Sequence, residues 1–174
     1  MKPTTYQKIY EQQAAFYKKR AWATKLLKIA NPVSAAVIAA GYLALCLLAL
    51  LPASHPSKGD FLRVLGAPAL CFITASCARV VFNRKRPYER SADEGGIEPI
   101  IHKSTTGHSF PSRHAACAFV IGTAAIAYMP PLGAGLLCVG IVIVYVRFAS
   151  GLHYPTDLLA GALWGAACGL LTFI

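Results

Sequence analysis

The stretch Arg147-Phe148-Ala149-Ser150-Gly151-Leu152-His153-Tyr154-Pro155-Thr156-Asp157 places three ionisable side chains between two strongly apolar runs. Pro155 suits the first position of a helix, because an N–H there would have no intrahelical acceptor. The apolar run 158–174 continues that helix, so His153 lies at its start and Asp157 one turn inside. A carboxylate so placed can hold one imidazole nitrogen as N–H and leave the other a free lone pair, which prepares a nucleophile or base.

Arg147 ends the preceding apolar run and carries a rigid fork of donors suited to an oxyanion. An arginine beside an oriented histidine favours phosphate as the ligand. A second interpretation fits this stretch equally well, namely that Arg147 and Asp157 form a buried structural ion pair.

The composition is typical of a membrane protein. Hydrophobic residues make up 56% and charged residues 14% of the 174 positions, whereas soluble domains average about 25% charged residues. The length fits one domain. The six cysteines are scattered through apolar runs without metal-ligand spacing, so we interpret them as small buried hydrophobic residues, neither disulfides nor metal ligands.

Five apolar runs approach the roughly 20 residues that cross a bilayer, namely 33–51, 61–82, 113–128, 132–146 and 158–174. The predicted fold class is therefore an all-α, polytopic membrane helix bundle of about five transmembrane helices. A loop is expected at 52–60, a turn at Met129-Pro130-Pro131 and one long polar segment at 83–110. Small residues at spacing four favour close helix packing within one chain over a dimer face; they are Gly161, Gly165 and Gly169.

Residues 4–29 interleave aromatic and lysine side chains and are too polar to cross a bilayer. They predict an interfacial amphipathic helix, with a plain cytosolic tail as the alternative. Asn31-Pro32 is expected to break the chain there. The predicted organisation is a basic N-terminal segment, 1–30, followed by a transmembrane domain, 31–174.

The net charge of +10 is distributed asymmetrically. If the basic N-terminus is cytoplasmic, the 83–112 segment and the 147–157 junction share its face, with every lysine and arginine except Lys58 and Arg63. We therefore predict a multi-pass protein of the plasma (inner) membrane with its site on the cytoplasmic face. The cations lie at the ends of apolar runs and not along a soluble face, which disfavours nucleic acid as a partner.

Two further segments carry candidate site residues. Arg79 and Arg86 are two helical turns apart, so they share a face if the helix continues to Pro87, which would end it. Ser112 lies where the third apolar run begins, so its hydroxyl and the N–H groups of residues 112–114 are free to bind an anion. His114, one turn into that helix, is a candidate general acid.

Together these three segments resemble the type 2 phosphatidic acid phosphatase (PAP2) superfamily, which includes vanadium haloperoxidases, bacterial acid phosphatases and glucose-6-phosphatase. Arg79-x6-Arg86-Pro87 is similar to the family's Lys-x6-Arg-Pro, with arginine for lysine. Pro111-Ser112-Arg113-His114 is similar to Pro-Ser-Gly-His, with Arg113 for glycine. Arg147, His153 and Asp157 match Ser-Arg-x5-His-x3-Asp at full spacing, with Val146 for serine. The resemblance covers roughly residues 60–174.

The resemblance implies that His153 attacks phosphorus to form a phosphohistidine, that Asp157 orients it and that His114 protonates the leaving oxygen. It implies a phosphate-binding set of Arg79, Arg86, Ser112, Arg113 and Arg147. Arg113 keeps the backbone N–H of the family's glycine but adds a bulky cation. Three arginines supply the charge that Mg²⁺ supplies elsewhere, so no metal or other cofactor is expected.

The implied substrate is a lipid phosphate, such as phosphatidate, phosphatidylglycerol phosphate, or polyprenyl phosphate or diphosphate. A vanadate haloperoxidase is disfavoured, because those relatives are soluble. A non-catalytic lipid-phosphate binding or transport protein would instead place charges along the middle of its spans. In the polar segment, six residues either contact the substrate headgroup or, equally, are solvated loop residues: Tyr88, Glu89, Glu98, His102, Lys103 and His108. Asp93 and Glu94 are expected to face solvent.

Overall fold

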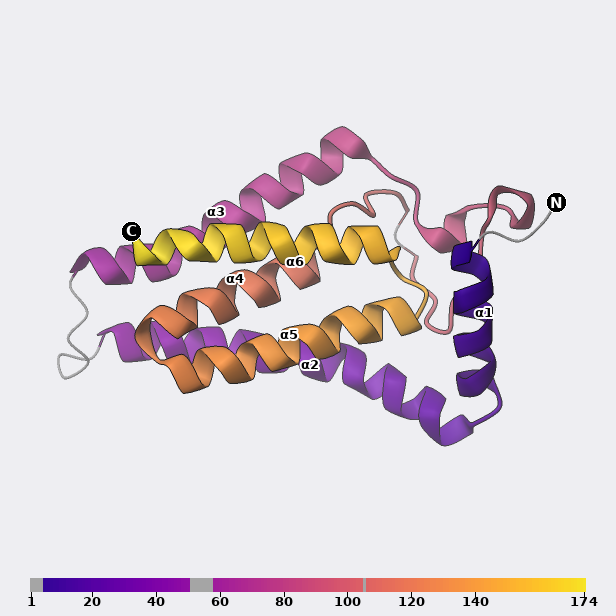
Figure 1. The fold of residues 1–174 in the computed structure, drawn as a ribbon, viewed down its shortest axis with the longest axis horizontal. Coiled ribbons are helices and arrows are strands. Elements are labelled where there is room, and N and C mark those ends of the chain that lie inside the picture. Colours follow the sequence, from indigo (N-terminus) through magenta and orange to yellow (C-terminus); the bar gives the residue numbers. More distant parts are fainter. Residues whose placement is uncertain (1–4, 51–57, 105) are drawn as a thin grey trace.

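The computed structural model describes residues 5–50, 58–104 and 106–174, and these residues form helices and no strand (Figure 1). The long helices are α1 (Thr5–Lys18), α2 (Ala21–Leu50), α3 (Lys58–Phe82), α4 (Arg113–Tyr128), α5 (Pro130–Ala149) and α6 (Pro155–Leu170). Three short 3₁₀ helices are η2 (Pro87–Glu89), η3 (Ala92–Glu94) and η4 (Leu171–Phe173). Among the described residues four helical segments are long and apolar enough to cross a membrane, and α4 is a shorter apolar helix. The predicted all-α membrane bundle is confirmed.

Helix α4 occupies the centre of the bundle. It contacts α2, α3, α5 and α6, and Figure 1 shows it between α6 and α5. Its inward positions, including Ala118, Val120 and Ala125, are fully buried against Val64 and Cys71 of α3. Neighbouring helices thus cover α4, while the outer helices expose large apolar side chains such as Leu62 and Leu163.

The glycines at spacing four bring the backbones of α6 and α4 together. A Cβ added at Gly161 would lie 2.4 Å from the Ser112 carbonyl oxygen, and one at Gly165 would lie 2.2 Å from that of Ala116. No side chain fits there, so the predicted packing within one chain is confirmed. The same contact lets the Ser112 N–H donate to the Asp157 carbonyl oxygen at 2.9 Å, which joins the starts of the two helices.

The N-terminal region differs from the expected single helix. Helix α1 ends at Lys18, the chain turns at Lys19-Arg20, and α2 then runs through Pro32 to Leu50. The predicted break at Asn31-Pro32 is therefore wrong. Proline inside a helix costs about 3 kcal/mol, and burial of Leu27, Ile38 and Leu45 along α2 offsets that cost. Whether residues 1–30 form a segment separate from 31–174 stays a prediction.

Helix α1 lies across one end of the bundle (Figure 1) and packs on the polar segment that precedes α4. The Tyr10 hydroxyl donates to the Glu98 carbonyl oxygen (3.1 Å) and accepts from the Ile100 N–H (3.2 Å). Gly151, with φ of 75°, lies beneath it, and a Cβ there would be 2.7 Å from the Tyr10 hydroxyl oxygen. The basic N-terminus and the polar segment therefore share one end of the molecule.

Other boundaries differ in detail. Most of the predicted 52–60 loop (51–57) lies outside the described residues, and α3 already begins at Lys58. All six cysteines are free, but Cys77 and Cys138 are exposed on the bundle, so the expectation that every cysteine is buried is wrong. Apolar lipid chains accept a cysteine side chain as readily as a protein core does.

Candidate active site

The three motif segments meet at the end of the bundle where α4 and α6 begin and α5 ends. The side chains of Arg79, Arg86, Ser112, Arg147, His153 and Asp157 are all buried there. His114 is half-buried and Arg113 is exposed. The chain thus concentrates its buried polar groups at the end that α1 and the polar segment cover.

The Asp157 carboxylate is the most fully bonded group of the cluster. One oxygen accepts from the Ser109 hydroxyl (2.5 Å) and from the Tyr154 N–H (3.2 Å). The other accepts from the Arg84 guanidinium at 2.7 Å. The alternative of a structural Arg147–Asp157 ion pair is therefore wrong, because Arg84 takes that place.

His153 is held through Ser109. Its Nδ1 lies 3.3 Å from the Ser109 Oγ and 3.7 Å from the nearer Asp157 oxygen. Because Ser109 donates its proton to Asp157, its oxygen accepts from His153 Nδ1–H. This network assigns the proton to Nδ1 and leaves Nε2 as a free lone pair.

His153 is also uncharged at neutral pH. Burial lowers the pKa of His153 to about 4, against the raising effect of Asp157, and Arg86 and Arg147 lower it further. The side chain is 2% exposed. A buried neutral imidazole with one free lone pair has the form that a nucleophile needs.

Three guanidinium groups from different elements lie in the same buried cluster as this histidine, and Arg86 and Arg147 are close enough to lower its pKa. Arg79, in the last turn of α3, donates to the Pro111 carbonyl oxygen (3.0 Å). Arg86 donates to those of Gly107 (3.2 Å) and Leu152 (3.4 Å). Arg147 ends α5 and is 4% exposed.

The shared helix face expected for Arg79 and Arg86 is wrong. Helix α3 ends at Phe82, Asn83 has φ of 34°, and Pro87 begins η2 instead of ending α3. Arg86 reaches the cluster from an extended loop, in which Glu89 accepts from its N–H (2.5 Å) and from that of Gly107 (2.6 Å).

No carboxylate pairs with Arg79, Arg86 or Arg147 within the part of the chain that the structure describes. Burying a cation without a counter-ion is costly. Nearby, burial lowers the pKa of Lys103, and the charges of Arg147 and Arg86 lower it further. This uncompensated positive charge suits an oxyanion with several oxygens.

Ser112 caps the start of α4, as predicted, but its N–H is bonded to Asp157 and is not free for an anion. Its hydroxyl is fully buried and has no hydrogen-bond partner in the described residues. A buried hydroxyl without a partner is costly, and this one is available for a hydrogen bond to a bound group.

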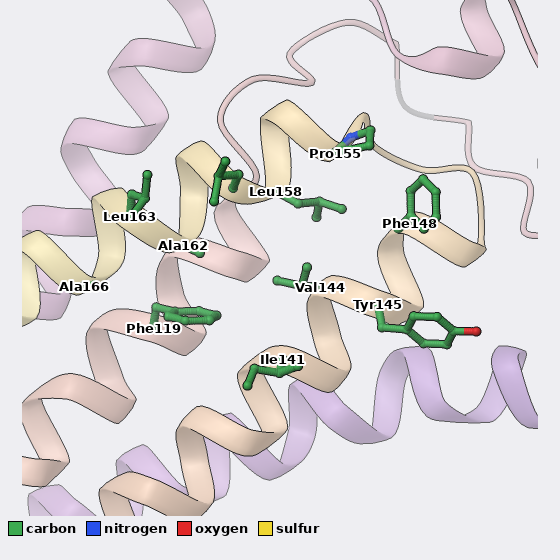
Figure 2. Close-up of a pocket in the computed structure, with 11 residues that line it drawn as sticks. Phe119, Ile141, Val144, Tyr145, Phe148, Pro155, Leu158, Ala162, Leu163 and Ala166 are labelled. Atoms are coloured by element: carbon green, nitrogen blue, oxygen red, sulfur yellow. The ribbon is translucent and has the colours of Figure 1, made fainter. Parts of the chain in front are cut away.

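Two hollows lie between the helices of the bundle. One, of about 250 Å³, lies among α2, α3, α4 and α5 and is lined by Arg113 and His114 with Ile38, Phe72 and Ile143. The other, of about 620 Å³, lies among α4, α5 and α6; Figure 2 shows Phe119, Val144 and Leu163 along it and Phe148 and Pro155 at its end. Its lining carries no charged group, so it suits hydrocarbon and not chemistry.

Four of the remaining polar candidates in the segment prove structural or solvent-facing. His108 shares a hydrogen bond with the Arg79 carbonyl oxygen (2.9 Å), Glu98 pairs with Lys18, and Glu89 braces the loop. His102 is exposed, as are Asp93 and Glu94, which agrees with the expectation for those two. Among the described residues no group of three or more His, Cys, Asp or Glu side chains gathers as metal ligands would.

Sequence reasoning missed Ser109 and Arg84. Ser109 lies three residues before Ser112, where a lone serine carries no distinctive signal. Arg84 belongs to the basic run 84–86, in which sequence reasoning assigned only Arg86 to the site and counted Arg84 only in the charge distribution. The contacts of both with Asp157 span 48 and 73 residues of sequence, and no local pattern predicts such pairs.

The fold and site define a membrane helix bundle with a buried cluster of arginine, serine, histidine and aspartate side chains at one end. The PAP2 superfamily model matches residues 60–174, and the chain belongs to this superfamily. Among curated protein sequences no relative matches.

Two solved structures share the fold. LpxE from Aquifex aeolicus has a TM-score of 0.61 and 24% identity, over 86% of this chain and 93% of that one. The transmembrane PAP2-type phosphatidylglycerolphosphate phosphatase from Bacillus subtilis has a TM-score of 0.50 and 20% identity, over 97% and 92%. Family and fold together support a membrane-bound phosphatase at the general level.

Proposed function

We propose that this protein is an integral membrane phosphatase that hydrolyses the phosphomonoester or diphosphate of a lipid through a phosphohistidine, without a metal ion. The observation that carries the proposal is the set of three buried guanidinium groups without carboxylate partners around a neutral, oriented His153. A phosphoryl transition state spreads negative charge over its equatorial oxygens, so positioning and positive charge provide most of the catalysis.

In the first step His153 Nε2 attacks phosphorus while the bond from phosphorus to the leaving oxygen breaks. His114 gives that oxygen a proton. Asp157 and Ser109 stabilise the positive charge that develops on the imidazole, since both lie at its Nδ1 side. In the second step water attacks phosphorus and gives a proton to His114 while the bond from phosphorus to His153 Nε2 breaks, which releases phosphate and restores both histidines. Arg79, Arg86, Arg147 and the unpartnered Ser112 hydroxyl hold the phosphoryl oxygens throughout.

The hollows support a lipid as the substrate. His114 lines an apolar cavity that opens between membrane helices, so a leaving group attached to hydrocarbon can reach it from the bilayer. Candidates are phosphatidate, phosphatidylglycerol phosphate, and polyprenyl phosphate or diphosphate. The Bacillus subtilis neighbour is a phosphatidylglycerolphosphate phosphatase, which favours testing phosphatidylglycerol phosphate first.

The test is phosphate release from this lipid panel in detergent with EDTA present, by wild type and His153→Ala. We expect release that survives EDTA and disappears in the variant. Absence of release from every lipid, or equal release by His153→Ala, would refute the assignment. Lipid-phosphate binding without turnover would then be the better account.

We further propose that the site faces the cytoplasm of a plasma (inner) membrane. The support is that residues 1–30 carry seven lysines and arginines against one acidic residue and that α1, within this basic segment, lies at the same end as the site. In a background without the six native cysteines, Ser104→Cys at the site end is expected to resist an impermeant thiol reagent in intact cells. Met129→Cys, exposed at the opposite end, is expected to react. The reverse labelling pattern would place the site outside.

A further inference from the structure

Arg113 stands apart from the other site arginines. Its side chain is exposed, and its guanidinium lies 5.5 Å from the ring centroid of Phe72 on α3. It lines the same cavity as His114, beside the apolar Ile38 and Ile143. The buried trio of Arg79, Arg86 and Arg147 thus surrounds the phosphoryl position, while Arg113 lies at its bilayer side.

The position of His114 decides what Arg113 can contact. In an in-line displacement the nucleophile and the leaving oxygen lie on opposite sides of phosphorus. His153 occupies one side, so the leaving group lies on the His114 side and extends into the cavity that Arg113 lines. Arg113 is therefore positioned to contact the leaving group and not the transferred phosphoryl oxygens.

Arg113 is the first residue of α4, and its side chain lines a mostly apolar cavity between membrane helices. Few groups in such a cavity can stabilise a cation, so a counter-charge nearby would be favourable. The Phe72 ring supplies only a weak cation–π contact at this distance. Among the described residues no carboxylate is paired with Arg113. An anionic group that arrives with the substrate would supply the missing counter-charge.

We infer that Arg113 forms a subsite for a second negative charge, carried by the leaving group of the substrate close to the scissile oxygen. This inference rests on the proposed function and narrows its substrate class. Two lipids share the required chemistry: a lipid diphosphate, whose inner phosphate departs, and phosphatidylglycerol phosphate, whose phosphodiester lies further along the leaving group. In both cases the bond between phosphorus and the leaving oxygen breaks, His114 supplies the proton, and water later releases inorganic phosphate.

The experiment compares two substrate pairs with matched tails: polyprenyl diphosphate against polyprenyl monophosphate, and phosphatidylglycerol phosphate against phosphatidate. The variants are Arg113→Gln, which removes the charge, and Arg113→Lys, which keeps it; Lys85→Gln is the control for an exposed cation. For each pair, the measured quantity is kcat/KM for the lipid with two phosphate groups divided by kcat/KM for the lipid with one. We expect Arg113→Gln to lower this ratio for one pair by about tenfold to a hundredfold, the size of a charge-assisted hydrogen bond. Arg113→Lys retains most of the ratio and Lys85→Gln all of it.

The pair whose ratio falls identifies the leaving group. Unchanged ratios in both pairs would overturn the inference and leave the phosphatase intact. A second readout does not depend on turnover: binding of the same four lipids to His153→Ala, with and without Arg113→Gln, measured by thermal shift. If binding of both lipids that carry two phosphate groups is insensitive to Arg113, the inference fails on this readout as well. Failure of the proposed function is seen separately, as absence of phosphate release by wild type.

Discussion

The contact between α4 and α6 consists of small residues and backbone atoms, whereas the site that it supports consists of long polar side chains. The helix contact uses glycines against backbone, and the Ser112 and Asp157 backbones are hydrogen-bonded directly across it. The site is assembled from side chains at the ends of α3, α5 and α6, from the loop before α4 and from the 150–154 turn. Its long polar side chains bond across dozens of residues of sequence. The contact fixes two helix starts by shape, whereas the loop brings charge to them.

Because of this difference, the helix contact should mainly determine stability, and the polar side chains of the site should mainly determine activity. Substitutions in the helix contact change the packing volume of the bundle, whereas substitutions in the loop change charge or one hydrogen bond. Each class of variant should therefore affect one property more than the other, and the following predictions test that separation in order of expected effect.

Arg147→Ala removes one buried donor to the phosphoryl group, and we expect kcat to fall by about 10²- to 10³-fold, the usual effect of losing one such donor. The melting temperature should change little, because an unpaired buried cation does not stabilise the empty protein. Steady-state phosphate release measures the effect. Lys85→Ala, an exposed cation beside Arg86, is the control and should behave as wild type.

Gly165→Ala should be destabilising by about 1–3 kcal/mol or more, because the new methyl group would meet the Ala116 carbonyl oxygen at 2.2 Å. Gly135→Ala is the matched control on α5, where a Cβ meets no atom within 4 Å. Thermal unfolding in detergent compares the two. Equal melting temperatures would show that α4 and α6 do not pack as described.

Ser109→Ala should lower kcat by about tenfold to a hundredfold with a small effect on KM, because it removes the acceptor that holds the His153 Nδ1 proton. Ser109→Thr should restore part of the loss, and Ser104→Ala, on the exposed loop, should have none. Nitrogen NMR of labelled histidine should show the Nδ1–H tautomer in wild type and a mixture in Ser109→Ala. An unchanged tautomer in this variant would exclude the positioning role.

The imidazole of His153 should stay uncharged well below pH 6. Its folded pKa of about 4 lies below the roughly 6.5 of an unfolded histidine, so the unfolded chain binds more protons between these values. Stability should therefore fall as the pH is lowered through that window, and His153→Asn should remove this part of the loss. NMR titration of the ring assigns the midpoint, and a value near 6.5 would contradict the described burial.

The smallest effects concern α1. Tyr10→Phe removes the donor to the Glu98 carbonyl oxygen and one of the two acceptors of the Ile100 N–H, which keeps its bond to the Ser150 carbonyl oxygen; it should cost about 0.5–1.5 kcal/mol. Lys18→Ala removes an exposed pair with Glu98 and should cost less than about 1 kcal/mol. Denaturation of the two variants side by side checks the difference, and an equal loss would mean that α1 is held by charge instead of burial.

Sequence alone predicted the helix bundle well, because span lengths and the glycine spacing are local patterns. The third span, 113–128, matches α4 residue for residue, and Pro155 begins α6 as expected. The break predicted at Pro32 was wrong, because burial of the long apolar face of α2 outweighs the cost of a proline inside the helix. The local sequence pattern does not reveal that burial.

The site was harder to predict in its details. The motif residues Arg79, Arg86, Ser112, Arg147, His153 and Asp157 do gather at one end. Their partners were not predictable, because Arg84 and Ser109 reach Asp157 only after the loop folds over the helix starts. Asp157 was expected to contact His153 directly, yet Ser109 lies closer to the imidazole, at 3.3 Å against 3.7 Å.

The most direct test of phosphoryl transfer to His153 is rapid-quench trapping with a substrate labelled in its terminal phosphate. The account predicts a transient label on the protein that is stable to alkali and labile to acid, maps to His153 and is absent in His153→Ala. An enzyme that turns over without label at any quench time, or a label that persists in His153→Ala, would contradict it.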